Sequence, residues 1–196
     1  MDIKSLCHVL DFAPKENSSG IFHRKYKCCD DYAIEVDFVK EKINYGDKIQ
    51  AESKTTQNFS QKENFVVLEC VDRLLTKGYK PQNIILEKTW PAGHGTSGRL
   101  DILVTRDDGS SYLMIECKTW GAEFEKELKK IEKNGGQLFT YFQQDKNADI
   151  LMLYCSNLSG KMVNFKNIII KIEEDLRQTG NVKDFHDRWN KLPKTN

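Results

Sequence analysis

The sequence predicts a mixed fold of the α/β class, an α+β sandwich in which helices pack on a central sheet. Residues 61–77 have the apolar spacing of a helix, and residues 99–117 have the pattern of two strands joined by a tight turn. Residues 123–155 then combine a helical pattern with an apolar strand. With a short strand at 83–87, the order becomes helix, strand, strand, strand, helix, strand, which is typical of a sheet covered by helices.

The composition is that of one ordinary globular domain. The chain has 196 residues, of which 39% are hydrophobic and 30% are charged. Its apolar runs are strand-sized and too short to cross a bilayer, and the N-terminus MDIKSLCHVLDF lacks the basic and apolar segments of a secretory signal. We therefore expect no membrane partner.

Cysteine usage indicates the expected compartment. Several cysteines lie inside apolar strand or helix patterns and none forms a CxxC pair, which favours buried free thiols. A reducing, cytoplasmic location is expected on this basis. The six cysteines are Cys7, Cys28, Cys29, Cys70, Cys117 and Cys155.

The formal net charge is +1, from 30 basic and 29 acidic residues. Tight nucleic-acid binding usually requires a basic surface, so this charge weighs mildly against strong, independent DNA binding. It does not exclude a nuclease, because carboxylates at a metal site subtract from the charge.

Three segments are expected along the chain. Residues 1–60 form an N-terminal extension with a β-hairpin and a polar linker, since apolar and acidic side chains alternate between Tyr32 and Phe38. Residues 61–170 form the core, and residues 171–196 form a C-terminal helix and linker.

Local signals predict each element of the core. The first helix runs from Gln61 to Lys77, and Gly78 stands where a C-terminal cap belongs. Asp108-Gly109 between apolar runs predicts a hairpin. The other predicted elements are a loop at 91–98, hairpin strands at 99–106 and 111–117, helices at 123–133 and 137–144, strands at 150–155 and 162–170, and a helix at 182–190.

The hairpin brings charged side chains together. With Asp108-Gly109 as a two-residue turn, Thr105 pairs with Tyr112 and Asp101 lies opposite Glu116. Lys118 lies on the same face as both carboxylates. The other face of the two strands is predicted to be wholly apolar, formed by Leu100, Ile102, Val104, Leu113, Ile115 and Cys117.

Two opposed carboxylates in a sheet repel each other, and folding alone does not require them. A cation reverses the sign of this interaction, and oxygen ligands suit Mg²⁺ or Mn²⁺. Lys118 could then orient a water or neutralise charge on a phosphate oxygen. The alternative is a solvated face on which Lys118 is an ion-pair partner. Leu103 and Met114 share this face and favour partial cover, so both interpretations stay open.

Asp101, followed on the next strand by Glu116 and Lys118 (a D…ECK pattern), resembles the PD-(D/E)XK nuclease superfamily. The segments GRLDILV, IECKTWG and GGQLFTYFQQ, within residues 63 to about 156, are similar to the N-terminal nuclease domains of type I restriction subunits and fused restriction–modification polypeptides. This resemblance implies a restriction-endonuclease-like core, metal binding by Asp101 and Glu116, and assistance to the attacking water by Lys118. Leu100 replaces the usual proline.

The resemblance also implies an acidic residue from the first core helix. Glu63 shares a helix face with Val67, Cys70 and Leu74, whereas Glu69 projects nearly opposite that face. Glu63 is therefore the predicted third metal ligand, with a favourable helix-dipole charge as the alternative.

Three further residues are candidates for supporting roles. Gln137 and Tyr141 share a helix face and resemble the Q-x-x-x-Y element of some nuclease subfamilies, which supports the substrate strand or the site. A functional role is predicted for Gln137, while Tyr141 fits that role or a place in the core. Glu87 is expected at the surface, with a supporting role in the site as the alternative.

These observations predict a Mg²⁺-dependent endonuclease domain that hydrolyses DNA, with Mn²⁺ able to substitute. Further domains or subunits of a restriction–modification enzyme are the expected partners. One alternative is a nuclease-like module that binds DNA or a partner without cutting. Another is a nuclease of the same fold that acts on RNA or branched DNA.

Overall fold

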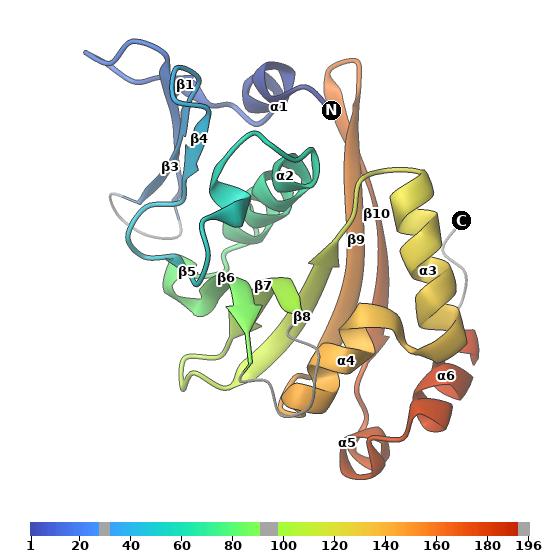
Figure 1. Ribbon diagram of the computed structural model, residues 1–196. Coiled ribbons are helices and arrows are strands. Elements are labelled where there is room, and N and C mark those ends of the chain that lie inside the picture. Colours follow the sequence, from blue (N-terminus) through green and yellow to red (C-terminus); the bar gives the residue numbers. More distant parts are fainter. Residues whose placement is uncertain (28–31, 91–97, 192–196) are drawn as a thin grey trace.

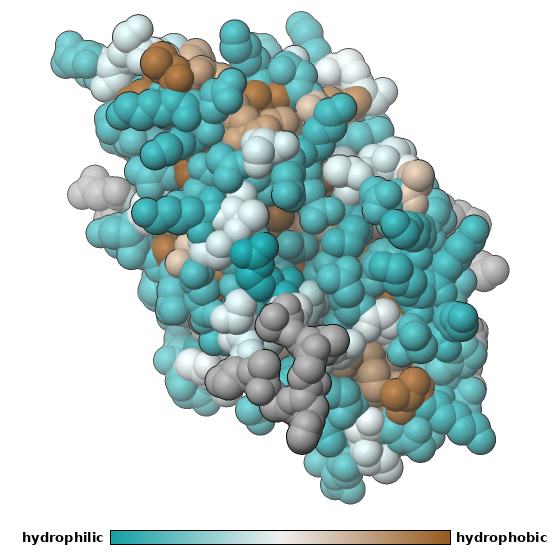
Figure 2. All heavy atoms as spheres, in the orientation of Figure 1, coloured by the Kyte–Doolittle hydropathy of each residue, from teal (hydrophilic) through white to brown (hydrophobic). Residues whose placement is uncertain are grey.

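The computed structural model describes residues 1–27, 32–90 and 98–191. Within these ranges the chain forms a mixed α/β fold with two β-sheets, one of four strands and one of six, and six α-helices (Figure 1). Figure 2 shows that the face seen in Figure 1 is covered mostly by hydrophilic residues, with scattered hydrophobic ones between them. The predicted fold class is confirmed at this coarse level.

The smaller sheet lies at the N-terminal end, where α1 (Ile3–Val9) begins with the Asp2 carboxylate accepting from the Ser5 amide at 2.8 Å. Its strands are antiparallel, and the alternation predicted between Tyr32 and Phe38 forms the third of them, with Ile34 and Val36 fully buried. In order the strands are β1 (Ala13–Pro14), β2 (Ile21–Lys25), β3 (Ala33–Asp37) and β4 (Lys42–Asn44).

The larger sheet carries the predicted hairpin at its centre. Its strand order is β10-β9-β8-β7-β6-β5, in which β8 and β9 are parallel, as are β5 and β6, and the other pairs are antiparallel. The first 60 residues thus contribute β5 to this sheet. The strands are β5 (Gln50–Ala51), β6 (Ile84–Thr89), β7 (Arg99–Thr105), β8 (Ser111–Cys117), β9 (Ile150–Ser159) and β10 (Met162–Lys171).

Helices cover both faces of the larger sheet. One face packs on α2 (Glu63–Thr76), and the other packs on α3 (Ala122–Asn134) and α4 (Gly136–Gln144). Gly135, with φ +86°, separates α3 from α4 at the predicted break. Two helices follow β10: α5 (Glu174–Thr179), which was not predicted, and α6 (Val182–Lys191), which packs on α3.

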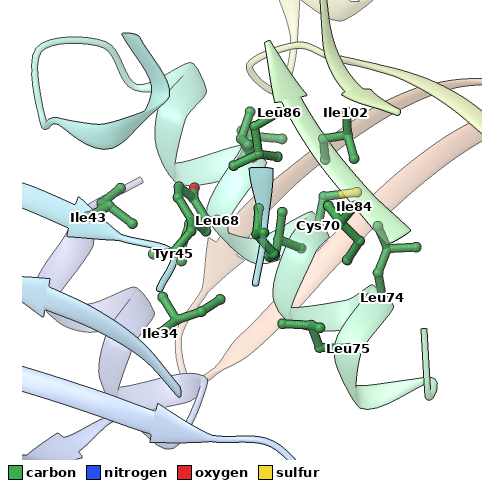
Figure 3. Close-up of a cluster of buried hydrophobic side chains, with 14 of the residues drawn as sticks. Ile34, Ile43, Tyr45, Leu68, Cys70, Leu74, Leu75, Ile84, Leu86 and Ile102 are labelled. Carbon is green, nitrogen blue, oxygen red and sulfur yellow. The ribbon is translucent and has the colours of Figure 1, made fainter. Parts of the chain in front are cut away.

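The helix α2 is enclosed between the two sheets. Ile34, Ile43 and Tyr45 of the small-sheet region contact the same apolar cluster as Leu68 of α2 and Ile84 of β6 (Figure 3). Small and large sheets therefore share one hydrophobic core through this helix.

This enclosure corrects the expected position of Glu69. The side chain was predicted to project away from the sheet, but it is 1% exposed. Its carboxylate lies 2.5 Å from the Arg73 guanidinium and accepts a hydrogen bond from the Tyr154 hydroxyl of β9 at 2.5 Å. The predicted orientation away from the sheet was wrong, because the Glu69 carboxylate contacts Tyr154 of the larger sheet.

The hairpin turn differs from the prediction, while its register near the charged residues does not. The Arg106 amide donates to the Ser110 carbonyl at 2.8 Å, so the loop has three residues and ends at Gly109, with φ +83°. Thr105 pairs with Ser111 instead of Tyr112, and a β-bulge restores the predicted pairing of Val104 with Leu113, Leu103 with Met114 and Ile102 with Ile115. Leu100 lies in the α3–α4 cluster instead of the predicted α2-side face.

Other expectations concern thiols and membranes. Cys7, Cys70, Cys117 and Cys155 are buried free thiols, whereas Cys28, Cys29 and the predicted loop up to residue 97 lie outside the described residues. In the described ranges no helix has both the length and the apolar character needed to cross a membrane.

Candidate active site

Four charged side chains meet where β7, β8 and the first turn of α2 come together. The Nζ atom of Lys118 lies 2.6 Å from Oε1 of Glu116 and 3.6 Å from Oε1 of Glu63. Asp101 accepts a hydrogen bond through Oδ2 from the Cys117 amide of β8, at 2.7 Å. The structure therefore brings together Asp101, Glu116, Lys118 and Glu63, as the hairpin register and the helix phase predicted.

Burial raises the pKa values of the three carboxyl groups in this cluster. Burial raises the pKa of Asp101 to about 7, although the nearby Lys118 ammonium acts in the opposite direction. Burial and then the charge of Asp101 raise the pKa of Glu116 well above its ordinary value. Burial also raises the pKa of Glu63, against the effect of Lys118. The interpretation as an exposed face is wrong for Glu116, whose side chain is 2% exposed, whereas Lys118 is an ion-pair partner as that alternative expected.

One oxygen of Glu116 lacks a partner. Its Oε2 atom is buried and has no hydrogen-bond partner among the described residues, while Oε1 is held by Lys118. Leaving a buried polar atom unsatisfied costs about 1–3 kcal/mol, so such an atom calls for an explanation. A bound cation or water at Oε2 removes this cost.

Glu87 is a second carboxylate whose expected position was wrong, and its burial leaves the alternative of a supporting role in the site. It was expected at the surface, but it is 5% exposed and lies on β6 opposite Asp101, between the pairs Leu86–Ile102 and Lys88–Leu100. Burial raises its pKa, opposed by Arg99, whose Nε lies 3.0 Å from Oε2 of Glu87.

The backbone of Glu87 is strained. Its φ is +56°, in the left-handed region that favours glycine. A strained non-glycine residue of this kind persists only when its surroundings hold it there, and such residues cluster at functional sites. No pattern in the sequence signals a left-handed residue inside a strand.

Gln137 and Tyr141 form a chain of hydrogen bonds to β7. The Gln137 side-chain amide donates to the Tyr141 hydroxyl at 3.2 Å, and this hydroxyl donates to the Arg99 carbonyl at 2.7 Å. Tyr141 is 2% exposed and stacks on Trp90, with ring centroids 5.9 Å apart. Burial and then the charge of Glu116 raise the pKa of the Tyr141 hydroxyl. Among the described residues, the Gln137 side chain therefore contacts Tyr141, which holds β7, and makes no hydrogen bond to the carboxylates of the site.

Glu127 of α3 was missed because it lies in a charge run that is typical of a solvated helix face. It is 2% exposed, and its Oε1 accepts from the Gln137 amide at 3.1 Å while Oε2 lies 2.8 Å from Nζ of Lys130. The helix break at Gly135 could have indicated it, because the first amides of α4 need an acceptor.

The described side chains contain no group of three or more His, Cys, Asp or Glu already arranged around a metal position. The Lys118 ammonium lies between Glu116 and Glu63 and supplies the positive charge there. No protein-family model matches the sequence, and no curated protein shows significant similarity to it.

Proposed function

We propose that this chain is a Mg²⁺-dependent endonuclease domain that hydrolyses phosphodiester bonds of DNA, as part of a cytoplasmic restriction–modification enzyme. The observation that carries the proposal is the buried, unpartnered Oε2 of Glu116, beside Asp101 and within the cluster held by Lys118. If the pair of Lys118 and Glu116 were purely structural, it would not need the second carboxylate, Asp101, which bonds to the end of the same strand, β8.

The side chains present fit a hard divalent cation. Asp101, Glu116 and Glu63 offer only oxygen donors, which is the ligand set that Mg²⁺ and Mn²⁺ prefer. Among the described residues, Asp101 is held by a backbone amide through one oxygen only, and Oε2 of Glu116 has no hydrogen-bond partner, so both groups have an oxygen available. These three residues would hold the metal.

The order of elements also supports the proposal. Along the chain, α2 is followed by β6, β7, β8, the α3–α4 pair and β9, with β9 parallel to β8. This is the order expected for the restriction-endonuclease-like core of the PD-(D/E)XK superfamily, although β5, β10 and the small sheet add to it. Fold order is support by analogy, so the chemical argument rests on the site.

In the proposed reaction, water attacks the scissile phosphorus and releases a proton to solvent, while the bond from phosphorus to the leaving oxygen breaks and that oxygen takes up a proton from solvent. Held by Asp101, Glu116 and Glu63, Mg²⁺ would supply Lewis-acid polarisation of the phosphate and would favour ionisation of the attacking water. Lys118 donates hydrogen bonds to the attacking water or to a phosphate oxygen, offsetting the negative charge that grows there. Tyr141, through the Arg99 carbonyl, holds the start of β7 that carries Asp101, and Gln137 holds Tyr141.

Two alternatives to a DNA endonuclease make different predictions. A module that binds DNA or a partner without cutting has no reason to keep carboxylates crowded at a desolvated position, which favours an enzyme. A nuclease acting on RNA or branched DNA uses the same site residues and differs only in substrate.

The test compares purified chain on supercoiled plasmid, linear duplex, branched DNA and RNA, with Mg²⁺ or with EDTA. We expect Mg²⁺-dependent cleavage of DNA that is lost in Glu116→Gln and in Lys118→Met. Lys130→Met is the matched control, because Lys130 also pairs with a buried glutamate, at 2.8 Å from Glu127, but lies outside the proposed site. Cleavage at wild-type rate by Glu116→Gln contradicts the proposal, and cleavage of RNA alone selects the alternative substrate.

A further inference from the structure

Arg99, the first residue of β7, is held by side chains from two other parts of the fold. Its Nε lies 3.0 Å from Oε2 of Glu87. Its Nη1 donates to the Ser53 hydroxyl at 3.1 Å and to the Thr55 hydroxyl at 2.8 Å. Arg99 precedes Asp101 by two residues on the strand, so the two residues lie about 7 Å apart along it.

The guanidinium retains unused donors. An arginine side chain has five N–H donors, one on Nε and two on each Nη. The Nε and Nη1 contacts engage three of these, and Nη2 has no partner among the described residues. Because the side chain is 45% exposed, a ligand in solvent can approach it. The guanidinium of Arg99 is thus held through Nε and Nη1, while Nη2 remains available to a ligand.

Residues 52–55, which include the two residues that hold Nη1 of Arg99, are hydrogen-bonded to β6 and to the start of α2. Glu52 accepts from Nζ of Lys88 at 2.7 Å and from the Thr89 amide at 2.8 Å, both on β6. The Asn64 side chain, in the first turn of α2 beside Glu63, donates to the Thr55 carbonyl at 2.8 Å. Residues 52–55 therefore connect β6, β7 and the start of α2 around the charged cluster.

We propose that Arg99 binds a phosphate group of the substrate strand next to the scissile phosphate, and that Glu87, Ser53 and Thr55 position its guanidinium. This inference rests on the proposed function, and adds to it a binding residue supported by the N-terminal part of the chain. Arginine suits this task because its planar fork forms directed, charge-assisted hydrogen bonds to phosphate oxygens. Fixing the side chain in advance removes the entropy loss that a free arginine suffers on binding.

The competing explanation is that Arg99 only neutralises the buried Glu87. That role needs the Nε contact alone and gives no reason for two hydroxyl groups to hold Nη1. It also predicts that substitution changes stability and leaves the affinity for DNA unchanged. The two explanations therefore separate in a binding measurement.

The experiment measures the dissociation constant of the full chain for a short fluorescein-labelled duplex by anisotropy, in EDTA so that no cleavage occurs. For Arg99→Gln we expect an increase of about tenfold and a salt dependence whose slope falls by about one. Arg99→Lys keeps the charge and the slope but loses the fork, so its dissociation constant rises less, by about threefold. Melting temperatures confirm that each variant is folded.

The matched control is Arg106→Gln. Arg106 follows the other end of β7, about 23 Å along the strand from Arg99, is 36% exposed and is also paired with a carboxylate, that of Asp149. This variant should bind DNA like the wild type. The double variant Ser53→Ala/Thr55→Val leaves the charge of Arg99 intact, and should weaken binding about threefold without changing the salt slope.

Unchanged affinity in both Arg99→Gln and Arg99→Lys overturns the inference, as does an equal loss in Arg106→Gln. These outcomes are independent of catalysis. If the wild type binds DNA through Arg99 but does not cleave it with Mg²⁺, the proposed function fails and the phosphate site stands. If the wild type cleaves DNA and Arg99→Gln has the same KM and dissociation constant, only the phosphate site fails.

Discussion

The ammonium nitrogen of Lys118 lies 2.6 Å from Oε1 of Glu116, and the two side chains are 13% and 2% exposed. Two opposite charges have therefore been removed from water together. Removing one partner from such a pair leaves the other charge desolvated, which typically costs about 3–5 kcal/mol. This relationship makes the stability of the site depend on its ionisation, which can be measured without a substrate.

Lys118→Met should destabilise the protein more at pH 8 than at pH 5. The pKa of Glu116 is already raised by burial, and loss of the Lys118 ammonium raises it further. For a carboxyl group whose folded pKa exceeds its unfolded value, stability falls as the pH rises from the unfolded value towards the folded one. Urea unfolding at both pH values checks this. An equal loss at pH 5 and pH 8 means that the pair is not electrostatically coupled.

Glu63→Gln and Glu69→Gln should have opposite effects, although both residues lie on α2. The side chain of Glu63 is 30% exposed, so its substitution should change the melting temperature little while reducing cleavage at least tenfold. The Glu69 side chain is 1% exposed and bonded to Arg73 and Tyr154, so its substitution should cost about 1–3 kcal/mol with normal cleavage per folded molecule. Equal losses of cleavage in the two variants exclude Glu63 from the site.

Asp101→Asn should change the pH dependence of stability between pH 4 and pH 7. The pKa of Asp101 is raised by burial to about 7, from an ordinary value of 3.8, so ionising this group costs stability progressively across that window. Asparagine carries no charge at any of these pH values. The melting temperature of the variant relative to wild type should therefore increase from pH 4 to pH 7. A constant difference over that range argues against a desolvated Asp101.

Binding of duplex DNA by the isolated chain should be weak and without sequence preference. The net charge of +1 allows few phosphates to be neutralised at once. Competition between labelled duplexes of different sequence at physiological salt measures this. Tight binding that discriminates strongly among them contradicts the expectation.

The sequence predicted the charged cluster because strand alternation and hairpin register follow short-range rules. Asp101 and Glu116 came together even though the turn was mispredicted, since the bulge after Val104 compensates for the three-residue loop. The extra residue in the loop and the extra residue in the bulge thus offset each other in the register. Such compensation cannot be read from local patterns, because turn type and bulge position depend on the twist of the whole sheet.

The remaining differences have tertiary causes. Glu69 was expected to project away from the sheet, but it bonds to Tyr154, 85 residues along the chain. Glu127 lies in a charge run typical of a solvated helix face, but it accepts from the backbone amide of Gln137 after the helix break. The strained backbone of Glu87 has no sequence signal. The polar residues Glu52, Ser53 and Thr55 were assigned to a linker, because their bonds to Arg99, Lys88 and Thr89 join segments more than thirty residues apart.

The central claim, that Asp101 and Glu116 together hold a divalent cation, is tested most directly by the shift in melting temperature with Mn²⁺. A ligand that binds only the folded state stabilises it by about 2.7 kcal/mol at a hundredfold excess over its dissociation constant. Millimolar Mn²⁺ should therefore raise the melting temperature of the wild type clearly, and much less that of Asp101→Asn or Glu116→Gln. If Mn²⁺ shifts the wild type and both variants equally, the carboxylate pair is not a metal site.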